Sequence, residues 1–108
     1  MPPLRRSPLP VRRALDATAE NLTGWRKLRG LTQAQLADRA GVERKTVARL
    51  EHGDGGVSTE NLMRVLRALG ILDLLSRSLD PYESDVGRLR ADEQLPQRIR
   101  TRRLTDDA

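Results

Sequence analysis

Two short apolar-periodic runs joined by three residues constrain the fold of this chain more than any other feature. In the stretch "QAQLADRAGVERKTVARLE", one run covers residues 33–40 and a second covers 44–51, with Gly41, Val42 and Glu43 between them. An isolated helix of this length is marginally stable in water, so packing against neighbours must hold each one. Gly41 permits a sharp exit from the first helix, and Val42 turns the chain inward. The pattern predicts two short packed helices joined by a tight turn.

The periodicity gives each short helix one apolar face and leaves the second helix with a basic outer face. The predicted core residues are Leu36, Ala37, Ala40, Val47 and Leu50, and the outward basic residues are Arg44, Lys45 and Arg49. A helix, a three-residue turn with glycine and a second helix form the arrangement of a helix-turn-helix, whose second helix enters the DNA major groove. Arginine suits such a surface because its fork can donate two hydrogen bonds to guanine O6 and N7. The alternative is a solvated helix face in a small helical bundle.

Three further helices are predicted around this pair, so the expected fold is all-α with five helices. The first begins near Val11 and ends at Gly30, with a glycine at position 24 that weakens it. The fourth follows the loop "GDGGVS", is capped by Ser58 and carries an apolar stripe at i, i+3, i+4 and i+7. The fifth is "ILDLLSRSL", residues 71–79, and it ends before an Asp-Pro pair.

The two ends of the chain differ in composition from the segment between them. Residues 1–10 contain four prolines and are expected to form a disordered arm. The helix-turn-helix domain is expected over residues 11–80. Residues 81–108 are expected to form a basic C-terminal tail, with a weak helix at 84–93. The basic residues of its last part are Arg98, Arg100, Arg102 and Arg103.

Composition favours an anionic partner and argues against an enzyme. The 108-residue chain has a formal net charge of +5, and residues 1–29 carry seven Arg or Lys against two acids. It contains no cysteine and one histidine, His52, so it lacks thiol nucleophiles, cysteine-bearing zinc sites and a catalytic triad. No cofactor and no metal are expected.

The remaining sequence signals indicate a reducing, cytoplasmic setting and no membrane association. No apolar run approaches the roughly 18 residues of a membrane span, and the first ten residues lack the apolar centre of a signal peptide. The glycine-rich segment 52–56, "HGDGG", is read as a turn. A phosphate-binding loop would require a preceding strand and a following Lys-Ser/Thr, and neither is predicted here.

The segment "LTQAQLADRAGVERKTVARLEHG" resembles the Xre/Cro-type helix-turn-helix of the lambda repressor and of many bacterial regulators. The resemblance runs from about Leu22 to Leu75 and includes the Thr-Gln opening, the Leu-Ala pair and the Gly-Val turn. "RLEHG" stands where the family usually ends in asparagine and glycine after an arginine or glutamate. The resemblance implies a lambda-repressor-like fold and a sequence-specific DNA-binding transcriptional regulator, which we expect to be a repressor.

The resemblance also assigns roles to individual residues of this chain. The base-reading positions would be Arg44, Lys45 and Arg49. A contact to the DNA backbone would come from Gln33, and Thr46 would lie near the backbone or be partly buried. Apart from the resemblance, His52 is expected to be a turn residue near the DNA backbone. Arg26 and Glu51 occupy positions that pair in these repressors and join the first helix to the end of the third.

One departure from the family pattern leaves three interpretations open. Glu43 opens the third helix, where an uncharged hydroxyl residue is common. A carboxylate there suits the positive end of the helix dipole, but it would also repel a phosphate or accept a hydrogen bond from cytosine N4.

Two kinds of protein partner are considered besides double-stranded DNA. A homodimer on inverted half-sites is expected, because a monomer reads too few base pairs to find one site in a genome. The surplus apolar residues of the fifth helix would form its interface, namely Ile71, Leu72, Leu74, Leu75 and Leu79. The alternative is that the C-terminal tail covers the surplus leucines. The alternative function is an antitoxin of the HipB kind, which neutralises a kinase-fold toxin and represses its own operon.

Overall fold

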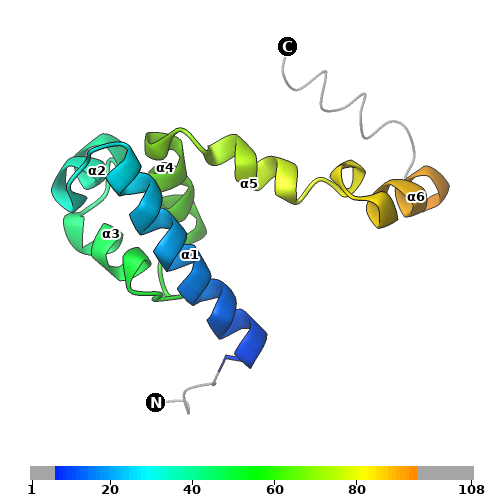
Figure 1. Ribbon diagram of the computed structural model, residues 1–108, viewed down its shortest axis with the longest axis horizontal. Helices are drawn as coiled ribbons and strands as arrows, with labels where there is room; N and C mark the ends of the chain where they lie inside the picture. The colour runs from blue at the N-terminus through cyan, green and yellow to red at the C-terminus, as the bar shows by residue number, and fades with distance from the viewer. Residues whose placement is uncertain (1–6, 95–108) are drawn as a thin grey trace. The chain divides into compact units, whose positions relative to one another are not determined.

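The computed structural model describes residues 7–94 of the chain, and this part is helical with no strand (Figure 1). The elements in order are α1 (Leu9–Leu28), α2 (Gln33–Ala40), α3 (Arg44–Glu51), α4 (Thr59–Leu69), α5 (Leu72–Ser78), the 3-10 turn η1 (Pro81–Glu83) and α6 (Asp85–Gln94). The all-α prediction is confirmed, and α6 is the helix expected at 84–93. In this described part, no helix is both long enough and apolar enough to cross a membrane.

The chain divides into two compact units, Met1–Leu72 and Asp73–Ala108. The boundary therefore falls at the start of α5, whereas the sequence pattern placed the end of the domain at residue 80. The first arm residues, 1–6, and the arginine-rich tail, 95–108, lie outside the described residues.

Helix α1 begins at Leu9, two residues before the predicted start at Val11. Pro8 occupies the N-cap position and Pro10 lies in the first turn. Proline is tolerated there because the first N–H groups of a helix have no intrahelical acceptor. The arm predicted over 1–10 is thus helical at its last two residues.

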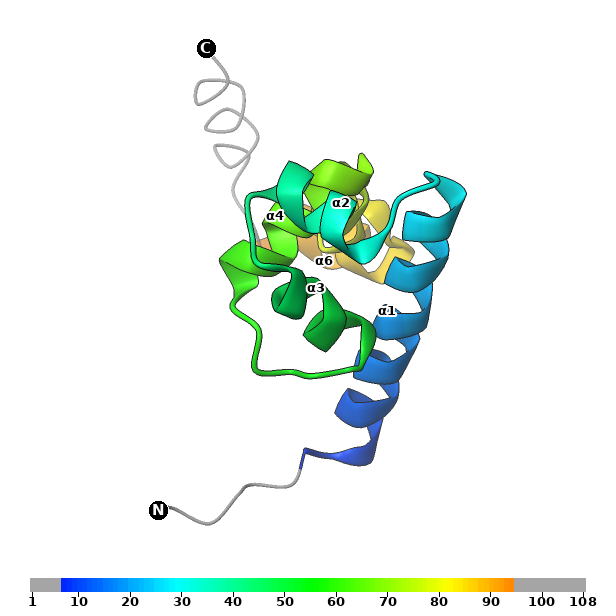
Figure 2. The same cartoon turned by 90° about the vertical axis from the view of Figure 1, so that its left-hand side faces the viewer.

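The core of the first unit lies where α1, α2 and α4 surround α3, which contacts all three (Figure 2). Its buried residues are Ala19, Leu22, Leu31, Leu36, Ala37, Ala40, Val47, Leu50, Val65, Leu66, Leu69 and Ile71. The five core residues predicted for α2 and α3 are among them. Leu28, at the end of α1, is exposed. Ile71 is buried in this unit, so it is unavailable to the dimer surface predicted for it.

The ends of α2 are closed by local hydrogen bonds that fix the turn into α3. Thr32 Oγ1 accepts from Gln35 N at 3.1 Å, and Gln35 Oε1 accepts from Thr32 N at 2.9 Å, which forms a capping box. At the other end Gly41 has φ 71°, a left-handed conformation that glycine adopts without steric cost. Val42 N then donates to Ala37 O at 3.0 Å. The sharp turn therefore has a specific backbone geometry.

Candidate nucleic-acid interface

Helix α3 presents its basic residues to solvent because its opposite face is fully buried. Val47 and Leu50 are buried among the neighbouring helices, whereas Arg44, Lys45 and Arg49 are exposed. The three long side chains predicted to read bases thus share the outer surface of one helix. Thr46, a predicted backbone contact, is half-buried at the edge of this surface.

A bidentate ion pair joins α1 to the end of α3. Arg26 Nε donates to Glu51 Oε2 at 2.7 Å, and Arg26 Nη2 donates to Glu51 Oε1 at 2.9 Å. Arg26 Nη1 also donates to the carbonyl of Leu31 at 2.9 Å. The two side chains are 14% and 7% exposed, so the pair is largely shielded from water. It fixes the C-terminal end of α3 against α1 and the α1–α2 loop.

The environment keeps this pair ionised. Burial raises the pKa of Glu51, but hydrogen bonds from Arg26, Gln33 and Thr23 outweigh burial and leave the pKa below its ordinary value. The hydrogen bond to Glu51 likewise raises the pKa of Arg26. A carboxylate that accepts several hydrogen bonds is stabilised in its charged form.

Gln33 links the half-buried Arg26–Glu51 pair to the exposed surface of α3. Its Nε2 donates to Glu51 Oε1 at 3.3 Å, and its Oε1 accepts from Arg44 Nη1 at 3.2 Å. The predicted backbone residue therefore lies beside one of the predicted base readers. A continuous hydrogen-bonded chain runs from Arg26 through Glu51 and Gln33 to Arg44.

Arg49 has a partner that the sequence analysis did not identify. Its Nε donates to Asp54 Oδ2 at 2.7 Å, and the two side chains are 45% and 40% exposed. The hydrogen bond from Arg49 lowers the pKa of Asp54, with a further contribution from the N–H of Gly56. Helical periodicity could not reveal this contact, because Asp54 lies in the turn after α3. The sequence feature that could have indicated this contact is an acidic residue that follows the basic helix by three positions.

Lys45, Arg49 and His52 meet around one hollow in the surface. Its volume is about 370 Å³, and its lining residues are Lys45, Ala48, Arg49, His52, Gly53 and Asp54. His52 is the C-cap residue of α3 and is exposed. The hollow combines hydrogen-bond donors with the small side chain of Ala48, so a base edge or a phosphate could approach the helix here.

Glu43 occupies the N-cap position of α3 but makes no capping hydrogen bond with its side chain. Its nearest ion-pair partner is Lys45, with Nζ 3.7 Å from Glu43 Oε2 and both side chains well exposed. Exposed pairs of this kind contribute little stability. Glu43 is thus free of strong contacts at the edge of the basic surface.

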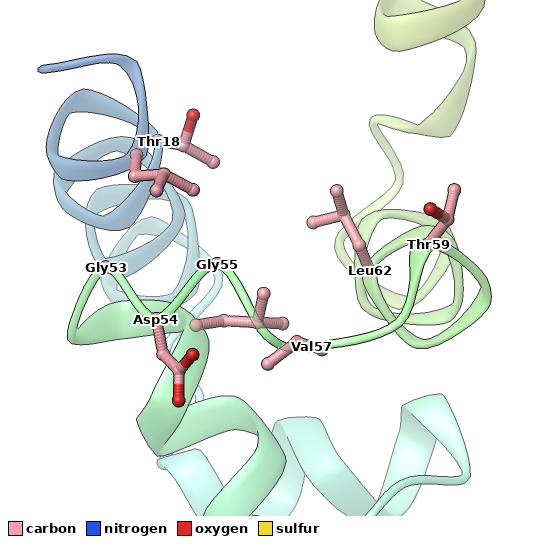
Figure 3. Close-up of a pocket in the computed structure, with 9 residues that line it drawn as sticks. Thr18, Gly53, Asp54, Gly55, Val57, Thr59 and Leu62 are labelled. Carbon is pink, nitrogen blue, oxygen red and sulfur yellow. The ribbon is translucent and has the colours of Figure 1, made fainter. Parts of the chain in front are cut away.

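The turn "GDGG" is shaped by packing against α1. An added Cβ at Gly53 would lie 2.9 Å from Asp16 Oδ1, and one at Gly55 would lie 3.1 Å from Leu15 Cδ1. A cavity of about 230 Å³ lies behind this turn, between α1 and the start of α4 (Figure 3). The carboxylate of Asp16 beside the turn would repel an anion. The turn interpretation therefore accounts for the glycines better than a phosphate-binding loop does.

A helix-turn-helix family model matches residues 25–74, which include the whole of α2, α3 and α4. Residues 25–74 are an Xre-type helix-turn-helix domain. This family is one of DNA-binding regulators, and the exposed basic surface of α3 lies within the matched segment. No curated protein and no solved structure matches the chain.

The apolar residues of α5 and of the turn after it differ in their exposure. Leu72 and Leu75 of α5 are half-buried, whereas Leu74 and Leu79 are exposed. Because Ile71 is buried, these four residues are the accessible part of the predicted dimer surface. The exposed apolar residues of the second unit also include Val86 and Leu89.

Proposed function

We propose that the protein is a sequence-specific transcriptional repressor that reads the DNA major groove with α3. The observation that carries this proposal is the set of three long donors on the outer face of a helix fixed at its end by the half-buried Arg26–Glu51 pair. A recognition helix needs both properties, because its side chains must reach base edges from a fixed backbone position. Such a function would place the protein in the cytoplasm, beside its DNA.

The proposed contacts divide into base readout and backbone positioning. Arg44, Lys45 and Arg49 would donate to base edges, and arginine would favour guanine through O6 and N7. Gln33, Thr46 and His52 would contact phosphate oxygens and fix the register without carrying sequence information. The hydrogen bond between Gln33 and Arg44 supports this division, since a phosphate-bound Gln33 would also orient its neighbour.

We propose further that the protein acts as a homodimer. The surface would use Leu72, Leu74, Leu75 and Leu79, which lie outside the buried core of the first unit. A two-fold dimer would read an inverted repeat if it placed its two α3 helices about 34 Å apart, one turn of B-DNA. Doubling the site would supply the selectivity that a single half-site lacks.

A second candidate is an antitoxin that binds a kinase-fold toxin and represses its own operon. The exposure of Val86 and Leu89 beyond the helix-turn-helix domain favours it, because exposed apolar side chains suit a protein partner. If a neighbouring reading frame encodes a kinase-fold protein, co-expression should yield a stable complex with the full chain. A neighbouring kinase-fold protein that does not co-purify would contradict this role.

The repressor proposal is tested by selection of bound sites from random DNA with the full chain. We expect a single enriched motif made of two inverted half-sites, each with a guanine-containing contact. Binding should weaken steeply with added salt, because basic side chains displace counterions from phosphates. Recovery of sequences with no common motif would contradict sequence-specific readout.

A further inference from the structure

Asp54 occupies a defined position directly after α3. Its Oδ1 accepts from the backbone N–H of Gly56 at 2.7 Å, while its Oδ2 accepts from Arg49 Nε at 2.7 Å. Because one carboxylate oxygen is held by the backbone of the turn, the other has a fixed place relative to the end of α3. Figure 3 shows the Asp54 side chain pointing away from the cavity behind the turn. Asp54 lines the hollow beside Lys45 and His52 as well as the cavity behind the turn.

The contact leaves the base-reading part of Arg49 available. A guanidinium has five N–H donors in a rigid fork, and Asp54 uses the one on Nε. The four donors on Nη1 and Nη2 include the end-on pair that matches guanine O6 and N7. An arginine held through Nε therefore presents its fork in a restricted direction and loses less freedom when it binds.

The neighbouring glycine keeps room for this arrangement. A Cβ added at Gly56 would lie 3.1 Å from Arg49 Nη2 and 3.1 Å from Asp54 Oδ1, closer than ordinary contact. Gly56 has no positive φ, so its backbone does not itself demand glycine. The absence of a side chain at position 56 thus fits the ion pair between Arg49 and Asp54.

We propose that Asp54 is a specificity-determining residue that positions the Arg49 guanidinium over one base pair. Its negative charge has a second effect, because it repels nearby phosphates and lowers the affinity for DNA that offers Arg49 no matching base. The carboxylate therefore weakens non-specific binding while it supports the specific contact. This inference rests on the proposed function, since it requires Arg49 to read a base.

The test compares affinities of full-length variants for the selected site, for each single-base change in it and for unrelated DNA. The variants are Asp54→Asn, Arg49→Ala, the double variant and Asp38→Asn. Asparagine at 54 keeps an oxygen for the Gly56 N–H but removes the charge. Asp38→Asn is the matched control, because it removes one exposed carboxylate from α2.

We expect Asp54→Asn to reduce discrimination by about tenfold at the position that Arg49→Ala relaxes, within the range of one bidentate base contact. It should also raise the affinity for unrelated DNA, and it should add no further loss of discrimination in the Arg49→Ala background. Asp38→Asn should keep the wild-type preference. Unchanged discrimination in a folded Asp54→Asn protein, or a loss at other positions, would overturn the role of Asp54 alone.

A second variant covers the case in which Asp54→Asn does not fold, as judged by circular dichroism. Gly56→Ala crowds Arg49 Nη2 without changing the charge, so it should weaken the preference at the same position. A folded Gly56→Ala protein with wild-type preferences would overturn the inference. If the wild-type chain prefers no DNA site, the proposed function fails. If the wild-type chain has a preferred site and Asp54→Asn does not change that preference, only the inference about Asp54 fails.

Discussion

The bidentate contact between Arg26 and Glu51 fixes the position of α3 at the level of single side chains. Removing two charges from water is costly, so a shielded pair is stable only when its geometry and remaining hydrogen bonds are good. Here Arg26 donates to both carboxylate oxygens and to a backbone carbonyl, and Gln33 supplies a further donor to Glu51. Loss of one partner would leave the other charge uncompensated.

Glu51→Gln is therefore expected to destabilise the domain by about 3 kcal/mol at neutral pH, the lower end for a broken buried pair. The pKa of Glu51 is lowered in the folded state, so the unfolded chain binds more protons at acidic pH. The stabilisation is fully present above the ordinary glutamate value of 4.5 and is lost as pH falls through the lower folded value. Urea unfolding of both proteins at pH 7 and near pH 3 measures this. A stability difference that stays constant or grows at acidic pH would contradict it.

The interface residues differ in how far the sequence could identify them. The family resemblance named Arg26 and Glu51 together, and the structure places them in contact. Asp54 had no such pattern, because its contact with Arg49 depends on the path of a turn. Ile71 was assigned to an exposed surface, since periodicity shows that a residue is apolar but does not show what covers it.

Within the helices, a glycine lowers or raises the stability of the fold according to the backbone conformation at its position. Gly24 lies inside α1 at an exposed position, without positive φ, and an added Cβ there would meet nothing within 4 Å. Gly41 ends α2 with φ 71°, and an added Cβ would lie 3.3 Å from Arg64 Nη1. The first glycine weakens a helix, whereas the second makes the turn between α2 and α3 possible.

We expect Gly24→Ala to stabilise the domain by about 0.5–1 kcal/mol, because alanine has the higher helix propensity and narrows the unfolded ensemble. Gly41→Ala should destabilise it by about 1–2 kcal/mol, because a side chain is strained in the left-handed region. Thermal unfolding followed by circular dichroism gives both signs. A destabilised Gly24→Ala protein would show that this position has a packing role absent from the structure.

The helices with strong local signals were the easiest to predict. The predicted bounds of 33–40 and 44–51 agree with α2 and α3, because each segment has helical apolar spacing and a glycine follows shortly after its end. The start of α1 was predicted two residues late, because the prolines of residues 1–10 were taken as a sign of disorder. Proline is also common in the first turn of a helix. The boundary between the two compact units, after Leu72, is set by tertiary contacts, so no local sequence pattern marks it.

For the molecule as a whole, the proposed repressor needs a second copy of the chain in addition to its own helix-turn-helix domain. The described part of the second unit, residues 73–94, buries Ala91 alone among its apolar residues. Leu74 and Leu79 in α5 and the turn after it remain exposed. A second copy of the chain would remove these side chains from water and pair two recognition helices.

Leu79→Glu should shift the protein from dimer to monomer, because burying an unpaired carboxylate in an apolar interface is costly. Leu28→Glu is the matched control, since Leu28 is similarly exposed in α1, at 79% against 72% for Leu79. Sedimentation equilibrium gives the mass of each variant, and circular dichroism verifies that helicity is retained. A wild-type chain that sediments as a monomer both free and on DNA would contradict the dimer.

In the proposed complex the outer face of α3 reads the DNA sequence, while Gln33 only positions the DNA backbone. The most direct test of this division of roles is the affinity of Arg49→Ala and Gln33→Ala for the selected site and for each single-base change in it. We predict that Arg49→Ala loses about 1–3 kcal/mol on the selected site and relaxes the preference at one position. Gln33→Ala should weaken binding to all these sequences by a similar factor. If Arg49→Ala instead lowered the affinity for every sequence equally, α3 would not be the reading helix in the way proposed.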